Sequence, residues 1–397
     1  MKSREWRKTG RPAHAIDPEK RQEYPGNVPA VLVVGNGLTG GGAEARLSRL
    51  VPRLFGGRVD LALLTGGHQP DAPCGGEVFY LGWKSRLSYP RLVLKLWRIV
   101  KNRQYDVVMS FGLFPVAITS LVLMGTASKP KFIVSEITRP DAAGPTENSL
   151  RQWIYYWLRR KLYRRGDLIT ANSIDGVIET CRLADAKLAV RLPNIVDVDR
   201  LGADAAREII DSISFRRYII CIGRLVTMKR INTVLEALAR IVRRVDCGLV
   251  IVGDGVARQA LEAQVQGMGL QESVMFTGRL ENPLPVLKRA SALVLASEYE
   301  GFSNSVLEAM FCDVPVITSY CSSDAREMCE QGAALGFEVG DAEQLGEHIV
   351  SIVTDEALGQ GLVQRAREYR APHAMDRAIP VYEDLILRVA GYEGSWR

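Results

Sequence analysis

Two glutamates separated by seven residues follow a predicted apolar strand. The stretch SEYEGFSNSVLEAMFCDVPVI, residues 297–317, places Glu300 on a loop and Glu308 one to two turns into the next helix. The amides at that helix N-terminus suit an anion, because they are unpaired and carry partial positive charge. A phosphate there, between carboxylates that accept hydrogen bonds from hydroxyls, would fit a sugar nucleotide. The alternative is a capping cluster with a solvated Glu308. The loop residues are Gly301, Phe302, Ser303 and Asn304.

Two cations stand on a second loop of the same kind. The stretch CIGRLVTMKRINTVLEAL, residues 221–238, predicts a strand, a loop that begins at Gly223, and a helix. Arg224 and Lys229 lie on the loop, five positions apart. Arginine can donate two parallel hydrogen bonds to phosphate oxygens and lysine adds a point charge, so together they could neutralise a diphosphate without a metal ion. The alternative is a pair of ordinary surface cations.

A glycine-rich stretch, VLVVGNGLTGGGAEA at residues 31–45, contains the pattern G-x-G-x-x-G after a predicted strand. Such a loop binds NAD only with an acid at the end of the second strand. That strand, VDLALLTGG, carries Asp60 at its start and Thr65 at its end. NAD binding is therefore the minority interpretation. The small residues Gly41 and Gly42 instead predict close approach of the backbone to a ligand across a cleft.

The elements that must position these residues alternate along the chain. Strands are expected at residues 30–34, 61–64, 78–81, 106–110, 131–135 and 168–172, and then at 218–222, 248–252, 274–277, 292–296 and 314–318. Helical patterns between them predict an α/β fold with two Rossmann-like parallel sheets facing across a cleft, where the strand ends bind ligands. The expected divisions are a mobile tail 1–26, an N-terminal domain 27–196, a linker 197–216, a C-terminal domain 217–375 and a final helix 376–397.

Composition narrows the class of protein. With 397 residues, 47% of them hydrophobic, the chain resembles a soluble protein with more than one core. Seven scattered cysteines without C-x-x-C and four histidines without ligand spacing predict neither disulfides nor a metal site, and they indicate a reducing compartment. The polar N-terminus does not read as a signal peptide.

Two basic, aromatic segments account for much of the net charge of +6. Residues 84–103 carry seven Lys/Arg and residues 151–165 carry six, with no acid in either. They predict docking on an anionic membrane surface rather than on nucleic acid. The alternative is that their apolar stripes are core packing. The uncharged stretch 107–128 is long enough to span a bilayer, but Gly112 and Pro115 favour a strand followed by a buried helix.

The ordered motifs resemble family 4 of the retaining glycosyltransferases. They are GGAE at residues 41–44, PNIVD at 193–197, GRL with Lys229, IVGDG at 251–255, and the pair Glu300 and Glu308. The resemblance implies a GT-B fold with a last helix that crosses back to the first domain. It also implies transfer of a hexose from a nucleotide diphosphate sugar to a hydroxyl of a glycan or lipid-linked glycan, without a metal ion or other cofactor.

The same resemblance implies residue roles. Glu308 would bind the ribose hydroxyls, and Glu300 with the neighbouring amides would bind the donor hexose. Arg224 and Lys229 would bind the diphosphate and stabilise the charge that grows on the leaving group. Gly41 and Gly42 would close over the phosphates. The base would stack near FTGRL, residues 276–280, which contains Gly278 and Arg279.

One departure concerns a histidine that many relatives carry after the strand matching DVVMSF. This chain has Met109, Ser110 and Phe111 there, so a mechanism that uses that histidine is in doubt. The expected enzyme works at the cytoplasmic face of a membrane. The alternatives are a sugar-nucleotide epimerase of GT-B shape, a non-catalytic glycan-binding protein and, more distantly, an NAD-dependent dehydrogenase.

Overall fold

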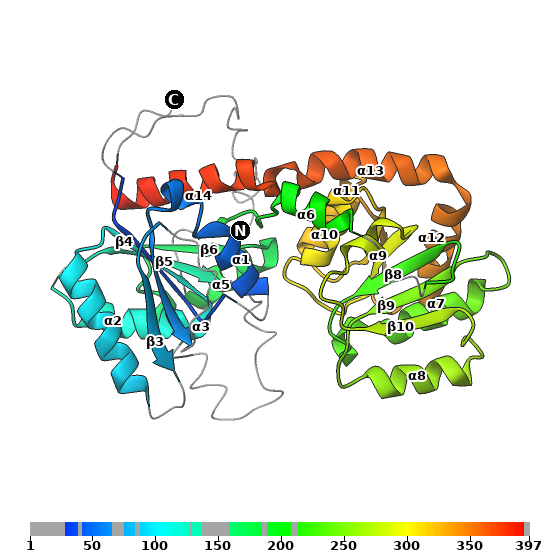
Figure 1. The fold of residues 1–397 in the computed structure, drawn as a ribbon, viewed down its shortest axis with the longest axis horizontal. Coiled ribbons are helices and arrows are strands. Elements are labelled where there is room, and N and C mark those ends of the chain that lie inside the picture. Colours follow the sequence, from blue (N-terminus) through cyan, green and yellow to red (C-terminus); the bar gives the residue numbers. More distant parts are fainter. Residues whose placement is uncertain are drawn as a thin grey trace, which may run out of the picture.

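Two α/β domains lie side by side, and a long helical segment runs along both of them (Figure 1). The structure is a computed structural model, and it describes residues 28–38, 42–65, 75–83, 88–127, 129–136, 157, 159–184, 189–207 and 213–392. Each domain contains one sheet, and all of the strand pairings within the two sheets are parallel.

The N-terminal sheet has seven strands in the order β3-β2-β1-β4-β5-β6-β7. Its strands are β1 (Val31–Gly35), β2 (Asp60–Thr65), β3 (Val78–Trp83), β4 (Val107–Phe111), β5 (Lys131–Glu136), β6 (Leu168–Ala171) and β7 (Ala189–Arg191). Its helices are α1 (Gly42–Leu50), the short 3-10 helix η2 (Leu54–Gly57), α2 (Tyr89–Arg103), α3 (Leu113–Met124) and α5 (Ile174–Ala184). Strands such as β1 and β4 are buried throughout, as parallel strands covered on both faces must be.

The C-terminal sheet has six strands in the order β10-β9-β8-β11-β12-β13. They are β8 (Tyr218–Ile222), β9 (Gly248–Val252), β10 (Val274–Gly278), β11 (Ala292–Leu295), β12 (Val316–Ser319) and β13 (Leu335–Phe337). The helices are α6 (Val198–Ala205), η5 (Thr227–Lys229), α7 (Ile231–Ile241), α8 (Arg258–Gly267), α9 (Leu284–Lys288), α10 (Asn304–Phe311), α11 (Ser323–Glu330), α12 (Ala342–Thr354), α13 (Glu356–Arg370) and η6 (Ala371–His373).

These elements confirm the predicted α/β class and its parallel sheets. Residues 107–111 form β4 and residues 113–124 form α3, as expected from Gly112 and Pro115. Across the parts of the chain that are described, no helix has the length and apolar character needed to cross a bilayer. The strands β7 and β13 were not predicted, because each has only three residues.

The chain crosses between the domains twice. The first crossing runs through Pro193–Asp197, and the second through η6 into α14 (Met375–Ala390). The two crossings pair with each other, since the Val196 amide donates to the His373 carbonyl (2.9 Å) and the Met375 amide to the Val196 carbonyl (2.9 Å). Helix α14 then packs on the N-terminal sheet, with Tyr382 in the core beside α1.

The interval 197–216 holds a helix. Helix α6 lies within it, and its Leu201 and Ala205 pack in the same core cluster as residues of α9 and α10. Asp197 caps α6 by accepting a hydrogen bond from the Arg200 amide (3.1 Å). This part of the expected linker is therefore structured and packs on the C-terminal domain.

Candidate active site

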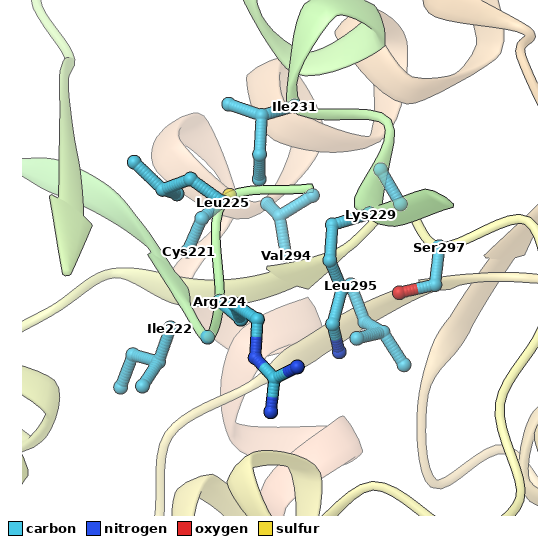
Figure 2. A pocket seen from close by; sticks show the side chains of 11 residues that line it. Cys221, Ile222, Arg224, Leu225, Lys229, Ile231, Val294, Leu295 and Ser297 are labelled. Carbon is cyan, nitrogen blue, oxygen red and sulfur yellow. The ribbon is translucent and has the colours of Figure 1, made fainter. Parts of the chain in front are cut away.

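The loop after β8 carries the predicted cations to the carboxyl edge of the C-terminal sheet. Figure 2 shows Arg224 and Lys229 pointing in the same direction from this loop, with Ser297 nearby. The loop is tied to the one after β11 by the Glu298 amide, which donates to the Met228 carbonyl (2.8 Å). Two loops that are distant in sequence therefore form one pocket.

The two predicted catalytic groups of opposite charge contact each other. Lys229 Nζ forms an ion pair with Glu300 Oε1, and the Ser297 hydroxyl donates to the same oxygen (3.0 Å). The Lys229 and Glu300 side chains are only 19% and 17% exposed. Arg224 is exposed and lines the pocket, and it forms no ion pair with any carboxylate in the described part of the chain. The site thus combines a paired lysine with an arginine that is open to a ligand.

The backbone of the two loops after β8 and β9 makes an unusually close approach. A Cβ added at Gly253 would lie 1.9 Å from the Gly223 carbonyl oxygen, and the φ of Gly253 is +142°. Only glycine fits there. The Gly253 amide in turn donates to the Gly278 carbonyl (2.9 Å) at the end of β10. Arg279 follows as an exposed residue, on the edge where a base is expected to stack.

The N-terminus of α10 has no cap from a side chain of its own helix. Its N-cap Ser303 makes no side-chain cap, and its first turn contains no acid. A second pocket is lined by the predicted donor loop, from Glu300 to Ser303, and by the first turn of α11 with the residue before it, including Ser322 and Asp324. This arrangement places the helix N-terminus and the carboxylates of Glu300 and Asp324 around the same space, as expected for an anionic, hydroxyl-bearing ligand.

Glu308 faces a different partner. It is partly buried on α10, and burial raises the pKa of its carboxyl while Arg49 of α1 opposes the rise. Arg49 is held by the first interdomain crossing, because its Nη1 donates to the Ile195 carbonyl (3.0 Å). Gly42 begins α1, the helix that carries Arg49. Gly41 lies outside the described residues.

The strand position of the expected histidine is filled by buried residues. Met109 and Phe111 lie in the core, and the Ser110 hydroxyl donates to Thr119 Oγ1 (2.8 Å) inside the domain. None of the three reaches the cleft. At the end of the next strand, Glu136 is also buried and is bound by Arg159 and Tyr163.

The structure corrects part of the predicted membrane surface. Arg159 is 1% exposed and Tyr163 is fully buried, so neither belongs to an outer basic face. Leu92 and Leu96 of α2 are also core residues, and Ile99 packs against the same core. The apolar stripe of residues 84–103 is therefore core packing. Trp153, Tyr155 and Tyr156 lie outside the described residues.

Several residues that shape the site were not predicted. Ser297 donates a hydrogen bond to Glu300, and the charge of Arg49 acts on Glu308. A lone serine or arginine gives no spacing signal. His373 was also missed as a structural group, although it is buried between the two crossings. Within the described residues, no group of three or more His, Cys, Asp or Glu side chains is placed to hold a metal ion.

Comparisons with known proteins agree with this architecture. The model of the family described as Glycosyl transferases group 1 matches residues 204–369, and that of the Glycosyl transferase 4-like domain matches residues 41–177. One relative is the N-acetylgalactosamine-N,N'-diacetylbacillosaminyl-diphospho-undecaprenol 4-alpha-N-acetylgalactosaminyltransferase of Campylobacter jejuni. It is 26% identical over 285 residues, which is 71% of this chain and 76% of the relative.

Solved structures show the same fold. HepE of Anabaena in complex with UDP has a TM-score of 0.74 at 17% identity, covering 91% of this chain and 99% of that one. The lipopolysaccharide outer core galactosyltransferase WaaB has a TM-score of 0.68 at 16% identity, covering 90% and 99%. Two facing Rossmann-like domains with a returning C-terminal helix define the GT-B fold. With the two family matches, the chain belongs to the family-4-like glycosyltransferases.

Proposed function

We propose that this glycosyltransferase is a retaining enzyme that moves a hexose from a nucleotide diphosphate sugar to a hydroxyl of a glycan or lipid-linked glycan, without a metal ion. The observation that carries the proposal is the pocket in which Arg224 and Lys229 point the same way and Lys229 pairs with Glu300. Cations on one side and a carboxylate beside helix amides on the other match the two halves of a sugar nucleotide.

Each residue then has one task. Arg224 and Lys229 bind the diphosphate and stabilise the charge that develops as the glycosidic bond to it breaks. Glu300 and the amides of Gly301 to Asn304 hold hexose hydroxyls, and Glu308 accepts hydrogen bonds from the ribose. The retaining outcome rests on the family resemblance.

The acceptor is proposed from the relatives and from charge. The Campylobacter jejuni relative is named for a diphospho-undecaprenol substrate, and WaaB for lipopolysaccharide outer core. A lipid-linked or cell-surface glycan acceptor would require the enzyme to work beside a membrane. We place it at the cytoplasmic face, as a peripheral protein that binds through its N-terminal domain.

The surface that would meet this membrane is the outer layer of the N-terminal domain. Helices α2 and α3 share one core with Leu162, and the Ser120 hydroxyl of α3 donates to the Leu162 carbonyl (3.4 Å), so these segments form one layer. This layer exposes several large apolar side chains next to cations, as membrane-binding surfaces do. They are Leu94 on α2, Leu121 and Met124 on α3, and Trp157, over whose ring Lys161 Nζ lies at 3.9 Å.

One set of assays tests the proposed reaction. The parent protein is titrated calorimetrically with UDP, GDP and ADP, and turnover of the matching sugar nucleotides is measured with and without EDTA. We expect one nucleotide to bind, transfer to survive EDTA, and the anomeric configuration to be kept in the product. Glu308→Ala should mainly weaken nucleotide binding, whereas Glu300→Ala should mainly abolish transfer.

The outcomes separate the alternatives. Loss of activity in EDTA that Mg²⁺ or Mn²⁺ restores would contradict the metal-free mechanism. Unchanged turnover in both variants would contradict the assignment of the two glutamates. Binding of nucleotide sugars with epimerised sugar as the product, or binding of glycan alone, would replace the transferase assignment.

A further inference from the structure

Two helices from different domains meet end to end beside the pocket. Helix α5 of the N-terminal domain and α11 of the C-terminal domain begin with the same arrangement of residues. Ser173 caps α5 by accepting from the Gly176 amide (3.0 Å), and Ser322 caps α11 by accepting from the Ala325 amide (3.1 Å). In both helices an aspartate stands two positions after the capping serine.

Each aspartate binds the other helix. The Asp175 carboxylate of α5 accepts from the Ser323 amide (2.8 Å) and hydroxyl (2.5 Å) of α11. The Asp324 carboxylate of α11 accepts from the Ile174 amide of α5 (2.9 Å). The first amide of each helix is therefore satisfied across the domain interface. Because the N-terminus of a helix is its positive end, each carboxylate is also favoured by the opposing helix dipole.

An ion-pair cluster supports this contact from the N-terminal sheet. Arg191 at the end of β7 binds Asp324 (2.8 Å) and Glu327 (2.9 Å), and the Tyr369 hydroxyl donates to Glu327 (3.2 Å). Asp324 itself is 1% exposed. A carboxylate buried so fully depends on these partners, because removing one leaves an uncompensated charge.

The same turn of α11 belongs to the candidate active site. Ser322, Asp324 and Ala325 line the pocket whose opposite wall is the donor loop with Glu300 and Phe302. The residues predicted to bind the diphosphate and the ribose, by contrast, stand on other elements of the C-terminal domain. A shift of α11 relative to α5 would therefore change the sugar pocket and its alignment with the N-terminal domain, while the nucleotide contacts stay in place.

We propose that Asp175, Asp324 and Arg191 form an interdomain clamp, built on reciprocal helix capping, that positions the sugar pocket against the acceptor-side domain. They are positioning residues and not catalytic ones. The catalytic consequence rests on the proposed function. Breaking the clamp should lower kcat for transfer by about 10- to 100-fold, the size expected when reacting groups are misplaced by a distant change. The affinity for the nucleoside diphosphate should change less than about threefold, a difference that amounts to a small fraction of its binding free energy.

The first test needs no substrate. Hydrogen exchange is followed in peptides covering residues 172–178 and 321–327, for the parent and for Asp175→Ala. Asp175 does not bind the Ile174 amide, so faster exchange in both peptides would show that the two contacts open together. Asp355→Ala is the matched control, because Asp355 caps α13 by accepting from the Leu358 amide (3.0 Å) within one domain. It should speed exchange only near its own helix.

The second test is kinetic. Asp175→Ala should lower kcat and leave the Kd for UDP, GDP and ADP, each titrated in turn, close to the parent values. Asp175→Asn should restore most of kcat, because its amide oxygen can accept from the Ser323 amide while its NH2 group donates to the Ser323 hydroxyl oxygen. Faster exchange confined to one of the two peptides, unchanged kcat, or an equal loss of nucleotide affinity would overturn the clamp. If the parent transfers no sugar, the exchange result still decides whether the clamp exists.

Discussion

Lys229 connects the phosphate side of the site to the sugar side. Its ammonium group pairs with Glu300, which also accepts a hydrogen bond from the Ser297 hydroxyl. A diphosphate entering beside Arg224 would share the lysine, and Glu300 would then be available to sugar hydroxyls. This pairing makes Lys229 more than an added positive charge, because its removal leaves a mostly buried carboxylate without its counterion.

We therefore expect Lys229→Ala to lower kcat by on the order of 10²–10³, the usual cost of one lost electrostatic contact to a developing charge. The measurement is steady-state transfer with the sugar nucleotide identified by titration. Arg230→Ala is the matched control, since the neighbouring arginine pairs only loosely with Glu298 (3.6 Å). A loss in the control as large as that in Lys229→Ala would mean that the loop, and not the lysine, is responsible.

The elements that carry the candidate site residues could be predicted where spacing carried the signal. Glu300, Arg224 and Lys229 stand between a strand and a helix, and Glu308 lies inside α10, as expected. Their roles stay predictions. Their partners could not be predicted. The electrostatic influence of Arg49 on Glu308 depends on how one domain faces the other, and the ion pair of Lys229 with Glu300 depends on how two loops bend.

At the scale of elements, apolar runs predicted most strands because buried parallel strands are nearly all hydrophobic. The same reasoning could not tell which apolar helical stripe faces the core. In α2, Leu92 and Leu96 are buried, while Leu94 is 46% exposed on the side that also carries Arg91 and Arg98. Helix α3 is apolar nearly all round, so its exposed Leu121 and Met124 could be identified only from the structure.

The outer layer formed by α2 and α3 leads to a prediction for membrane binding. Replacing Arg91 and Arg98 together by Ser should reduce binding to vesicles of phosphatidylglycerol and phosphatidylcholine by roughly tenfold or more, because each cation near an anionic leaflet contributes about 1 kcal/mol. Replacing Leu121 and Met124 together by Ser should reduce it by a similar factor, because their apolar side chains would no longer enter the interface. Co-sedimentation measures the bound fraction. The double substitution of Arg91 and Arg98 should also make vesicle binding less dependent on salt.

The control for this surface is Val256→Ser. Val256 is 92% exposed on the C-terminal domain, so it tests whether any exposed apolar side chain matters. Equal binding of the parent to vesicles of phosphatidylcholine alone, or no binding to the anionic ones, would mean that the exposed layer does not dock on a membrane.

At the scale of the whole molecule, the two crossings meet at one buried histidine. The Asn194 amide of the first crossing donates to His373 Nδ1 (3.0 Å) in the second, and the His373 ring lies 5.0 Å from that of Phe302 on the donor loop. An Nδ1 that accepts a hydrogen bond must be unprotonated. The imidazole is therefore neutral, and it connects the two crossings to the donor loop.

Burial, together with the nearby positive charges of Arg191 and Arg46, lowers the pKa of His373 from 6.5 to about 3. In the unfolded chain the His373 imidazole is protonated below pH 6.5, whereas in the native protein it stays neutral down to about pH 3. The stability that the neutral imidazole contributes is therefore fully present above pH 6.5 and is lost as the pH falls. Lowering the pH from 7.5 to 5.0 should therefore reduce the free energy of unfolding by about 2 kcal/mol through His373 alone. Urea unfolding at the two pH values measures it.

His373→Phe should be less stable than the parent at pH 7.5, because the Asn194 amide loses its acceptor, but its stability should fall by about 2 kcal/mol less on going to pH 5.0. His348→Phe, which replaces a partly buried histidine bonded to the Gly336 carbonyl (3.0 Å), controls for loss of a histidine as such. Identical pH dependence in the parent and in His373→Phe would mean that His373 takes up its proton in the native state. A neutral imidazole would then not be what joins the two crossings.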